Sequence, residues 1–384
     1  MAVTFRFPTF IHFGAGAIQL APELLGKAKV RRPLVVTDKG LASSPLIAGV
    51  LKNLSTADFH TSLYAEAEGN PLISHVEKGV AAFRKHDADS VVLVGGGCAL
   101  DVGKAIALMS KHPGNLLDYE DDKVGALPIK KELIPMMLAV PTTAGTGSEV
   151  GGSSVVSRDD NHQKIIVWGH ELVPPRVIAD PELTISLPPH LTAATGIDAL
   201  THNVEAFLAK NFHPLAEGVA LEGVRHVHKH LVRAFTTPKD LEARGGMLLA
   251  AMMGATAFQK GLGVTHSCAH ALSTCYDLHH GLANALMLIP SLEFNLEVVP
   301  EKFVRLGECI GLAGSNETKA QGFLAWLREL KKQLKIPSSL RDLNVKLTPR
   351  LVDVAVNDAC HANNPRPCTR TDFTNLFKKA GAMT

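Results

Sequence analysis

Several side chains in the second half of the sequence have the types and spacing of a divalent-metal site. Asp198 and His202 are four residues apart, so on a helix they share one face about one turn apart. His266 and His270 repeat this spacing further along the chain, and His280 follows them. A carboxylate and neutral imidazoles suit Fe²⁺, Zn²⁺, Ni²⁺ or Mn²⁺ without any cysteine. Asp198, His202, His266 and His280 are therefore fit to hold one divalent metal ion.

The same spacing also occurs without a metal. Histidine pairs on an amphipathic helix are more often on the surface or in the core, and this chain has 18 histidines. His226, His228 and His230 cluster with no evident chemistry. Small residues around the candidate ligands favour a metal, because we expect them to leave room for a ligand and water: Gly261, Gly263, Ser267, Ala269, Gly281 and Ala283. The spacing by itself leaves both interpretations open.

Six motifs in a fixed order resemble those of the iron-containing (group III) alcohol dehydrogenase family. They are VTDKG (Val36–Gly40), GGGCALDVGK (Gly95–Lys104), PTTAGTGSEV (Pro141–Val150), GIDALTH (Gly196–His202), GLGVTHSCAH (Gly261–His270) and HHGLAN (His279–Asn284). The resemblance covers nearly the whole chain. It implies that Asp198, His202, His266 and His280 bind Fe²⁺, with Zn²⁺ as the alternative. It also implies that His270 faces the same site without binding metal and is a candidate for proton transfer.

Length and composition exclude several other classes of protein. The 384 residues are enough for two domains, and a hydrophobic fraction of 46% with 20% charged residues is ordinary for a globular protein. The net charge of +2 gives no electrostatic footprint for nucleic acid. We expect no signal peptide, no membrane span, and cysteines kept reduced in the cytoplasm. The partner is then a small-molecule substrate, and the family suggests a homodimer or higher homo-oligomer.

The pattern of apolar residues divides the chain into two parts. Buried strands are predicted at 33–38, 59–64, 90–97 and from 136, and helices at 46–54, 76–86 and 99–111. This alternation is typical of a parallel α/β sheet with ligands at the strand carboxyl ends. From about Thr192 the spacing is helical almost throughout. We predict an α/β dinucleotide-binding domain at 1–185 and an all-helical metal-binding, catalytic domain at 186–384, with the resemblance implying a Rossmann-like, dehydroquinate synthase-like architecture.

A glycine triplet follows one of the predicted strands. Without Cβ atoms, Gly95, Gly96 and Gly97 let backbone N–H groups approach a pyrophosphate at the start of a helix. A tight strand–helix turn explains the triplet equally well, and the G-x-G-x-x-G fingerprint is absent. The other glycine-rich segment, FGAGA (Phe13–Ala17), has no convincing strand before it, so we assign it a structural role.

The resemblance extends these assignments around the glycine triplet. The family binds the pyrophosphate with this turn, but Cys98 stands here in place of the usual serine, so a good hydroxyl donor is lost. Asp101 is expected to line the cofactor site. Lys104 matches a family position but is equally well explained as a charge on the helix surface. Asn70 and Lys164 match further positions that line the cofactor cleft.

Asp38 ends the first predicted strand, where a carboxylate can accept hydrogen bonds from the ribose hydroxyls of a nucleotide. The resemblance therefore favours NAD over NADP, because the carboxylate repels a 2′-phosphate; the alternative is a turn or capping aspartate. In the third motif, Thr142, Thr143 and Thr146 offer hydroxyls on a glycine-flanked loop, which the resemblance implies binds the phosphates and the nicotinamide ribose. Thr146 and Glu149 also have the spacing of a capping box that opens a helix.

The implied reaction is hydride transfer between NAD and a primary alcohol/aldehyde pair. A metal Lewis acid polarises the substrate oxygen, and His270 relays the proton. The segments AFQKGLG, which contains Lys260, and ACHANNPR, which contains His361, resemble the 4-hydroxybutyrate dehydrogenase branch. We expect Lys260 to pair with the carboxylate of an ω-hydroxy acid. If Lys260 is instead a solvated charge at a helix end, a general dehydrogenase of short neutral alcohols or diols is the alternative.

Two other classes of protein are also considered. A metallohydrolase would use the same kind of metal site to activate water, but it leaves the Asp38 strand end and the Gly95–Gly97 turn unexplained. A metal- or nucleotide-binding protein without catalysis leaves His270 without a purpose, because the resemblance places it beside the ligands but not among them. Both are remote alternatives to the oxidoreductase.

Overall fold

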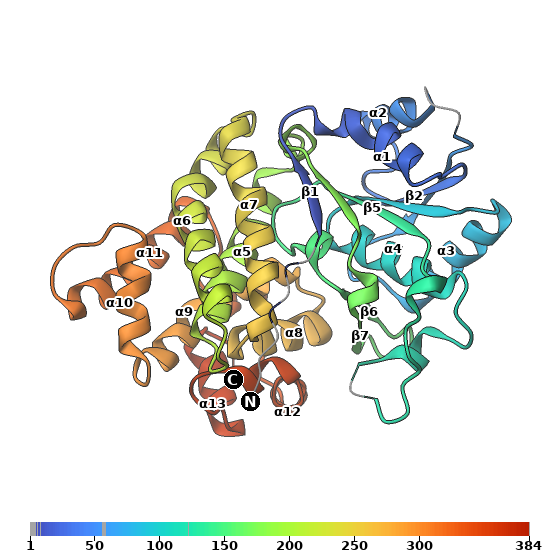
Figure 1. Ribbon diagram of the computed structural model, residues 1–384. Coiled ribbons are helices and arrows are strands. Elements are labelled where there is room, and N and C mark those ends of the chain that lie inside the picture. Colours follow the sequence, from blue (N-terminus) through green and yellow to red (C-terminus); the bar gives the residue numbers. More distant parts are fainter. Residues whose placement is uncertain (1–4, 6, 8, 56–58, 122, 384) are drawn as a thin grey trace. The chain divides into compact units, whose positions relative to one another are not determined.

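The computed structural model describes residues 5, 7, 9–55, 59–121 and 123–383. The chain forms two compact units (Figure 1). The α/β unit comprises Phe7–Thr143 and Ser148–Ser186, and the helical unit includes Ala144–Gly147 and Leu187–Thr384. The break after Ser186 lies one residue from the predicted boundary. The sequence did not predict that the short loop Ala144–Gly147 belongs to the helical unit.

A six-stranded parallel sheet forms the centre of the α/β unit, with the order β1-β8-β5-β4-β2-β3. The middle strands are buried on both faces, which explains their continuous runs of Val and Leu. From β2 the chain proceeds in one direction to β3 and in the other to β4, β5 and β8, so the order reverses between β2 and β4. The strands are β1 (Phe10–Phe13), β2 (Pro33–Asp38), β3 (Ser62–Ala67), β4 (Ser90–Gly95), β5 (Met136–Pro141) and β8 (Arg176–Ala179).

Helices cover both faces of this sheet (Figure 1). On one face, helices α1 and α2 pack on Val35, Val92 and Leu138 in one apolar cluster. On the other face, α4 comes so close that a Cβ at Gly103 would lie 1.9 Å from the side chain of Leu93. Alternate residues of a strand point to opposite faces, so the two clusters use different residues of the same strands. The helices are α1 (Ala21–Lys27), α2 (Pro45–Ser55), α3 (Ile73–Lys85) and α4 (Gly97–Met109).

Three parts of the α/β unit differ from the prediction. An antiparallel hairpin, β6 (Ser153–Ser157) with β7 (Lys164–Trp168), was not predicted and packs on α4. Strand β3 lies a few residues later than the predicted 59–64. Strand β1 directly precedes the FGAGA segment, so the expectation of no strand there was wrong. The short edge strand was missed because its side chains are mostly exposed and lack a buried, alternating pattern.

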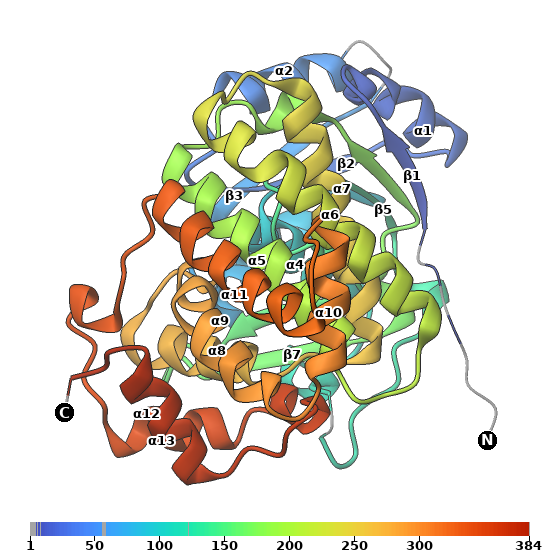
Figure 2. The ribbon, with the colours of Figure 1, turned by 90° about the vertical axis from the view of Figure 1, so that its left-hand side faces the viewer.

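The helical unit begins with three long helices, α5 to α7, that pack against one another (Figures 1 and 2). Gly223 and Gly246 allow this packing, because a Cβ there would lie within 2.3 Å of Asn203 or His230. Helices α8, α9, α12 and α13 share a second apolar core. Within the described part of the chain, the α-helices of this unit are α5 (Pro189–Leu208), α6 (Pro214–Thr236), α7 (Leu241–Ala257), α8 (Val264–Tyr276), α9 (His280–Leu296), α10 (Pro300–Cys309), α11 (Asn316–Gln333), α12 (Pro349–Val356) and α13 (Arg370–Lys379).

Short 3-10 helices connect many of these elements, and three of them bear on the site: η4 (Ser148–Val150), η7 (Phe258–Lys260) and η9 (Ala359–Asn363). Among the described residues, no single helix has both the length and the apolar character needed to cross a membrane. One sharply bent pair, Leu241–Lys260 with Val264–Tyr276, meets those two criteria jointly.

Candidate metal centre and nucleotide-binding residues

The structure brings the four predicted ligands together from three helices. Asp198 and His202 lie one turn apart on α5, His266 is in the first turn of α8, and His280 begins α9. One ligand atom from each of the four lies within 4.8 Å of the others. Asp198 Oδ1 is 3.5 Å from His280 Nε2 and 4.0 Å from His266 Nε2. The prediction that these residues form one group therefore agrees with their geometry.

These separations fit a bound metal. Four ligands at bond lengths of about 2.1 Å in a tetrahedron are roughly 3.4 Å apart, close to the spacing of this group. The side-chain amide of Asn284 already approaches the same atoms. Its Nδ2 is 2.7 Å from Asp198 Oδ1, 3.2 Å from His280 Nε2 and 3.4 Å from His266 Nε2. One amide group thus contacts a carboxylate oxygen and two imidazole nitrogens that converge. Such oxygen and nitrogen atoms are the ligands that a divalent cation prefers.

Glu205 fixes one of these ligands and was not among the predicted residues. Its carboxylate accepts a hydrogen bond from Nδ1 of His266 at 2.6 Å, which leaves Nε2 for the metal. The backbone N–H groups of Gly263 and Thr265 also donate to it. Burial by itself would raise the pKa of Glu205, but His266 and Thr265 lower it, so the carboxylate is ionised. Glu205 is seven residues after Asp198 on the same helix face, a spacing from which it could have been predicted.

Two glycines let the helices that carry the candidate ligands pack closely against neighbouring atoms. A Cβ at Gly281 would lie 2.3 Å from the carbonyl oxygen of Ala194, so only glycine lets α9 begin this close to α5. A Cβ at Gly263 would lie 2.8 Å from Glu205 Oε1. The small residues around the histidines were expected to leave room for a ligand and water. These two glycines instead leave room for neighbouring protein atoms, so that expectation was wrong for them.

His202 is buried, like His266. Burial lowers the pKa of His202 to about 4, so the ring is neutral at physiological pH and keeps a lone pair for metal binding. Its ring stacks on that of His266, with centroids 4.7 Å apart. The ring of Phe258 lies against it from η7. These contacts hold the imidazole in place without using its charge.

His270 lies beside the four ligands, as the resemblance implied. Its ring stacks on His280 with centroids 5.2 Å apart and meets the edge of His266 at 6.0 Å. Nδ1 of His270 is 2.7 Å from a carboxylate oxygen of Asp358, which caps η9 from the C-terminal part of the chain. Burial alone would raise the pKa of Asp358, but His270, Ser267 and the Cys360 N–H lower it well below the usual range. No spacing in the sequence connects Asp358 to His270, so this contact was not predicted.

The two residues proposed to bind substrate are occupied within the helical unit. Lys260 is 1% exposed, and its Nζ is 2.8 Å from Glu217 and 2.9 Å from the carbonyl oxygen of Phe207. It is therefore neither a solvated charge nor an ammonium available to a substrate carboxylate. Nε2 of His361 is 3.0 Å from the Val356 carbonyl oxygen, and its ring packs on Phe373. Both side chains are used for packing, which corrects the expectation for Lys260.

Predicted nucleotide-binding residues meet at the carboxyl ends of three neighbouring strands. Asp38 ends β2, Gly95 ends β4, and Thr142 and Thr143 follow β5. Gly95 has a φ of 152°, and a Cβ on it would lie 2.6 Å from Ala99 and 3.2 Å from Asp38 Oδ2. A Cβ on Gly96 would lie 3.1 Å from the Thr143 side chain. The turn therefore requires glycine, and it lies where the strand order reverses, which is where nucleotides bind in such sheets.

Asp38 and Cys98 flank this turn. Oδ1 of Asp38 accepts a hydrogen bond from the backbone N–H of Leu41 at 3.0 Å, so Asp38 stabilises the turn that follows β2. Burial raises the pKa of Asp38, partly offset by the backbone N–H groups of Leu41 and Gly40. Cys98 lies in the first turn of α4, and burial raises the pKa of its thiol, so it remains protonated. Ribose binding by Asp38 remains a prediction.

Lys104 and Asp101 form a buried cluster that the sequence did not predict. Lys104 is completely buried, and its Nζ contacts Ser148 Oγ at 2.7 Å and the carbonyl oxygens of Gly151 and Ser153. Ser148 Oγ donates to Asp101, and the backbone N–H of Val155 donates to it at 3.1 Å. The interpretation of Lys104 as a surface charge was wrong. Lys104 and Asp101, both on α4, hydrogen-bond the segment that follows β5 and hold it against this helix.

The remaining predicted residues are divided between the units. Ser148–Val150 is a short 3-10 helix, so no capped α-helix begins near Thr146, and that prediction was wrong. Thr146 belongs to the helical unit, where a Cβ on its neighbour Gly147 would meet Ala251 and Ala255 of α7. Asn70 and Lys164 lie near each other. The backbone N–H of Ser157 donates to the carbonyl oxygen of Pro71, the neighbour of Asn70, and Ser157 is the strand partner of Lys164.

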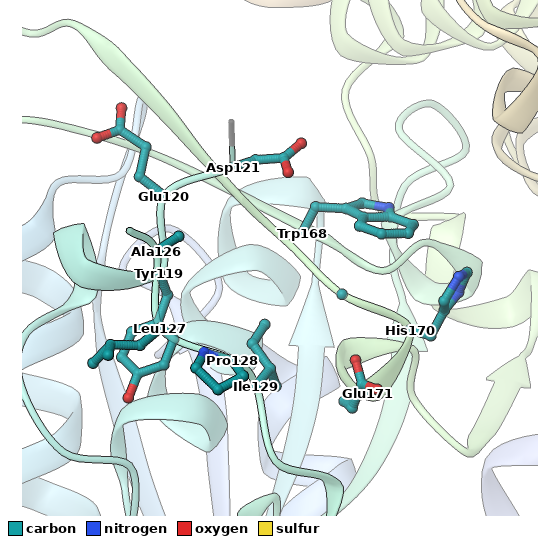
Figure 3. Close-up of a pocket in the computed structure, with 11 residues that line it drawn as sticks. Tyr119, Glu120, Asp121, Ala126, Leu127, Pro128, Ile129, Trp168, His170 and Glu171 are labelled. Atoms are coloured by element: carbon teal, nitrogen blue, oxygen red, sulfur yellow. The ribbon is translucent and has the colours of Figure 1, made fainter. Parts of the chain in front are cut away.

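A surface pocket of about 250 Å³ lies in the α/β unit. Figure 3 shows Trp168 and His170 on one side and Tyr119, Leu127 and Pro128 on the other. The rings of Trp168 and His170 meet edge to face at 4.7 Å. None of the predicted site residues lines this pocket, so it is not the predicted nucleotide site.

Comparisons with known proteins agree with this arrangement. A family described as iron-containing alcohol dehydrogenase matches residues 8–181, and the Fe-containing alcohol dehydrogenase C-terminal family matches residues 192–381. The chain is 35% identical to a 4-hydroxybutyrate dehydrogenase of Cupriavidus necator, over 97% of this chain and 98% of that protein.

Two solved structures have the same fold over nearly their whole length. A 1,3-propanediol oxidoreductase is 33% identical with a TM-score of 0.94, covering 99% of this chain and all of the other. A sulfoacetaldehyde reductase from Bifidobacterium kashiwanohense, solved in complex with NAD⁺, is 26% identical with a TM-score of 0.89 over the full length of both.

The chain belongs to the iron-containing alcohol dehydrogenase family. It is an oxidoreductase of the NAD-linked alcohol dehydrogenase class, and iron is the metal of that family. The predictions of the family, of the fold class and of the cofactors are therefore confirmed.

Proposed function

We propose that Asp198, His202, His266 and His280 hold the catalytic metal of this dehydrogenase, and that His270 is its proton-transfer group. The observation that carries this proposal is the convergence of the four ligand atoms within 4.8 Å beside the His270 ring. When bound, the metal supplies a Lewis acid for the substrate oxygen, and the nicotinamide accepts or returns the hydride.

The protein's own residues orient these groups. Glu205 keeps Nε2 of His266 available by holding Nδ1, and Asn284 holds Asp198. Asp198, His202 and His266 are buried, which excludes water from their side of the site. His280 and His270 are partly exposed, so the substrate side of the metal group lies next to them. His270 accepts the proton that the alcohol releases and returns it in the reverse reaction.

For the nucleotide, we propose that Asp38 binds the adenosine ribose and that the start of α4 binds the pyrophosphate. The N-terminus of this 13-residue helix supplies about half a positive charge and free backbone N–H groups. Thr143, whose side chain lies next to Gly96, and Thr142, whose N–H donates to the Gly95 carbonyl oxygen, complete the set within the α/β unit. Since the Asp38 carboxylate would repel a 2′-phosphate, we expect NAD to be used far more efficiently than NADP.

The proposed substrate is a primary alcohol with an anionic far end, and 4-hydroxybutyrate is the first compound to test. Two of the similar proteins are named for compounds with an anionic far end, the alcohol 4-hydroxybutyrate and the aldehyde sulfoacetaldehyde. A neutral alcohol or diol is the second candidate. It is favoured by the burial of Lys260, which leaves that residue unable to pair with a substrate carboxylate, and by the likeness to a 1,3-propanediol oxidoreductase.

Anaerobic NADH formation by the Fe²⁺-loaded enzyme distinguishes the two candidates. The rates with 4-hydroxybutyrate, 1-butanol and 1,3-propanediol should be compared as kcat/KM. A preference of tenfold or more for the hydroxy acid, about 1.4 kcal/mol of transition-state discrimination, supports the anionic substrate. A preference for the neutral alcohols assigns the enzyme to the second candidate. Lys260→Met should leave the KM values for all three substrates unchanged, because the Lys260 ammonium is held by Glu217.

We infer that the protein forms a homodimer through the edge strand β1. Phe10 and Phe13 are 68% and 46% exposed, and no described strand pairs with the outer edge of β1. An exposed apolar edge strand readily pairs with a second copy of itself. The particle mass measured by light scattering should be about twice 41.0 kDa, and Phe10→Asp should shift it toward the monomer. We also place the protein in the cytoplasm, which fractionation of the source cells would test.

A further inference from the structure

Asp358 is bound so tightly that it can determine which nitrogen of His270 carries the proton. One carboxylate oxygen accepts hydrogen bonds from Ser267 Oγ at 2.7 Å and from the backbone N–H of Cys360 at 2.9 Å. The other faces Nδ1 of His270 at 2.7 Å. Ser267 Oγ itself accepts the N–H of His361 at 3.0 Å. With one oxygen held by two donors, the carboxylate cannot rotate away from His270.

This contact restricts the imidazole in two ways. An ionised carboxylate only accepts hydrogen bonds, so Nδ1 of His270 must be the N–H that donates. The His270 ring also lies between Asp358 and the ring of His280. The centroids of the two imidazole rings are 5.2 Å apart, and their planes make an angle of 21°. Nε2 is then the ring's remaining lone pair. An imidazole without this partner could adopt either tautomer and could turn about its side-chain bonds.

We propose that Asp358 is a positioning residue that holds His270 as the Nδ1–H tautomer, so that Nε2 is the atom that exchanges the substrate proton. The inference rests on the proposed role of His270. During oxidation the O–H bond of the alcohol breaks, the electron pair stays on oxygen, and an N–H bond forms at Nε2. In reduction the proton returns from Nε2. Asp358 keeps its charge throughout and accepts the Nδ1–H bond in both states.

The variant Asp358→Asn tests this directly. The Asn oxygen can still accept from Ser267 and Cys360, which turns its NH₂ group toward Nδ1 of His270. The ring would then have to carry its proton on Nε2, the wrong nitrogen. We expect kcat to fall roughly 10²-fold, the usual contribution of such proton transfer. We expect KM to change less than about twofold and the bound metal to remain, because the carboxylate touches none of the four ligands.

Asp353→Asn is the matched control, because Asp353 is an exposed carboxylate on α12 that pairs with Arg370. Its kcat should equal that of the parent enzyme. Ser267→Ala is a second variant, in case Asp358→Asn folds poorly; it loosens the carboxylate but keeps its charge. We expect a smaller loss of kcat for Ser267→Ala, with metal content again unchanged.

Two measurements separate positioning from a merely structural role. In the His270→Ala background, Asp358→Asn should have no further effect on kcat, because residues that act through one another are not additive. In protein with ¹⁵N-labelled histidine, the His270 ring signals, identified by their loss in His270→Ala, should report Nδ1–H in the parent and Nε2–H in Asp358→Asn.

An equal loss of kcat in both backgrounds, or an unchanged tautomer, overturns the inference while leaving His270 in its role. If His270→Ala itself turns over at the parental rate, the proposed role of His270 fails, and the inference fails with it.

Discussion

Two clusters of buried polar groups, one in each unit, differ in where their cation comes from. In the α/β unit, the acceptors Ser148 Oγ, Gly151 O and Ser153 O surround the ammonium group of Lys104, which the chain supplies itself. In the helical unit, the lone-pair atoms of Asp198, His266 and His280 converge on one point. The neutral side-chain amide of Asn284 donates to Asp198 there and approaches both imidazole nitrogens.

The difference shows how a structural cluster is distinguished from a metal site. Both clusters are buried, and both contain an aspartate. The Lys104 cluster is already neutralised by its own ammonium, so its role is to hold loops against α4. In the Asp198 cluster, which has the ionised carboxylate of Glu205 beside it, the proposed metal would supply the cation. Burial does not distinguish the two clusters, but the group at the centre does: it is an ammonium in the first and a neutral amide in the second.

Removing the internal cation should have the largest effect. Lys104→Met leaves the Asp101 carboxylate buried without its ammonium partner, 3.8 Å away in the parent protein. We expect the free energy of unfolding to fall by about 3–5 kcal/mol, the usual cost of breaking a buried pair. Denaturant unfolding measures this loss. Lys52→Met on the exposed face of α2 is the matched control and should change stability by less than about 0.5 kcal/mol. Equal losses in both variants would refute the role of Lys104.

Glu149, next to the Lys104 cluster, should make stability depend on pH. Burial raises the pKa of Glu149 from 4.5 to about 7, and its Oε1 has no hydrogen-bond partner among the described residues. Between these pH values the unfolded chain loses the proton while the folded protein keeps it. Stability therefore falls as pH rises through that window, and the loss is complete above the folded pKa. Glu149→Gln should remove this fall and gain about 3 kcal/mol above pH 7. Parallel stability curves for parent and variant would contradict the assignment.

In the helical unit, Glu205→Gln sharpens the comparison from the other side. The glutamine keeps the shape of the side chain but loses the charge that orients His266. We expect metal affinity to fall by about 10–100-fold while the fold is retained. Metal competition with a chelator gives the affinity, and circular dichroism reports the fold. Glu222→Gln on α6, which pairs with Arg225 on the surface, is the control. An affinity equal to the parent's would show that Glu205 only supports the backbone.

Sequence patterns predicted the parts of the fold that depend on local periodicity. Strand Pro33–Asp38 was predicted to the residue, and the helices that carry the ligands follow from four-residue spacing. Strand β1 and the β6–β7 hairpin were missed, because these strands are only four or five residues long and partly exposed. Their pairing is set by partners distant in the chain, which no local pattern contains.

The candidate site was predictable to the same extent. The four ligands could be named because they lie in short motifs, whereas Asp358 reaches His270 from 88 residues away. Lys104 and Lys260 show the opposite error. Each was expected to face solvent or substrate, as most lysines do, but each is buried against partners in other elements. Only the tertiary structure shows that their charges are already paired.

Metal stoichiometry measured together with turnover tests the central claim most directly. The Fe²⁺-loaded parent should bind one metal ion per chain and form NADH from alcohol. His266→Ala should lose both together, because it removes one of the four converging ligands. His226→Ala on α6 removes a histidine that stacks on His230 outside the group, and it should keep both. A His266→Ala protein that retains one metal ion per chain and turns over at the parental rate would contradict the assignment of the metal site.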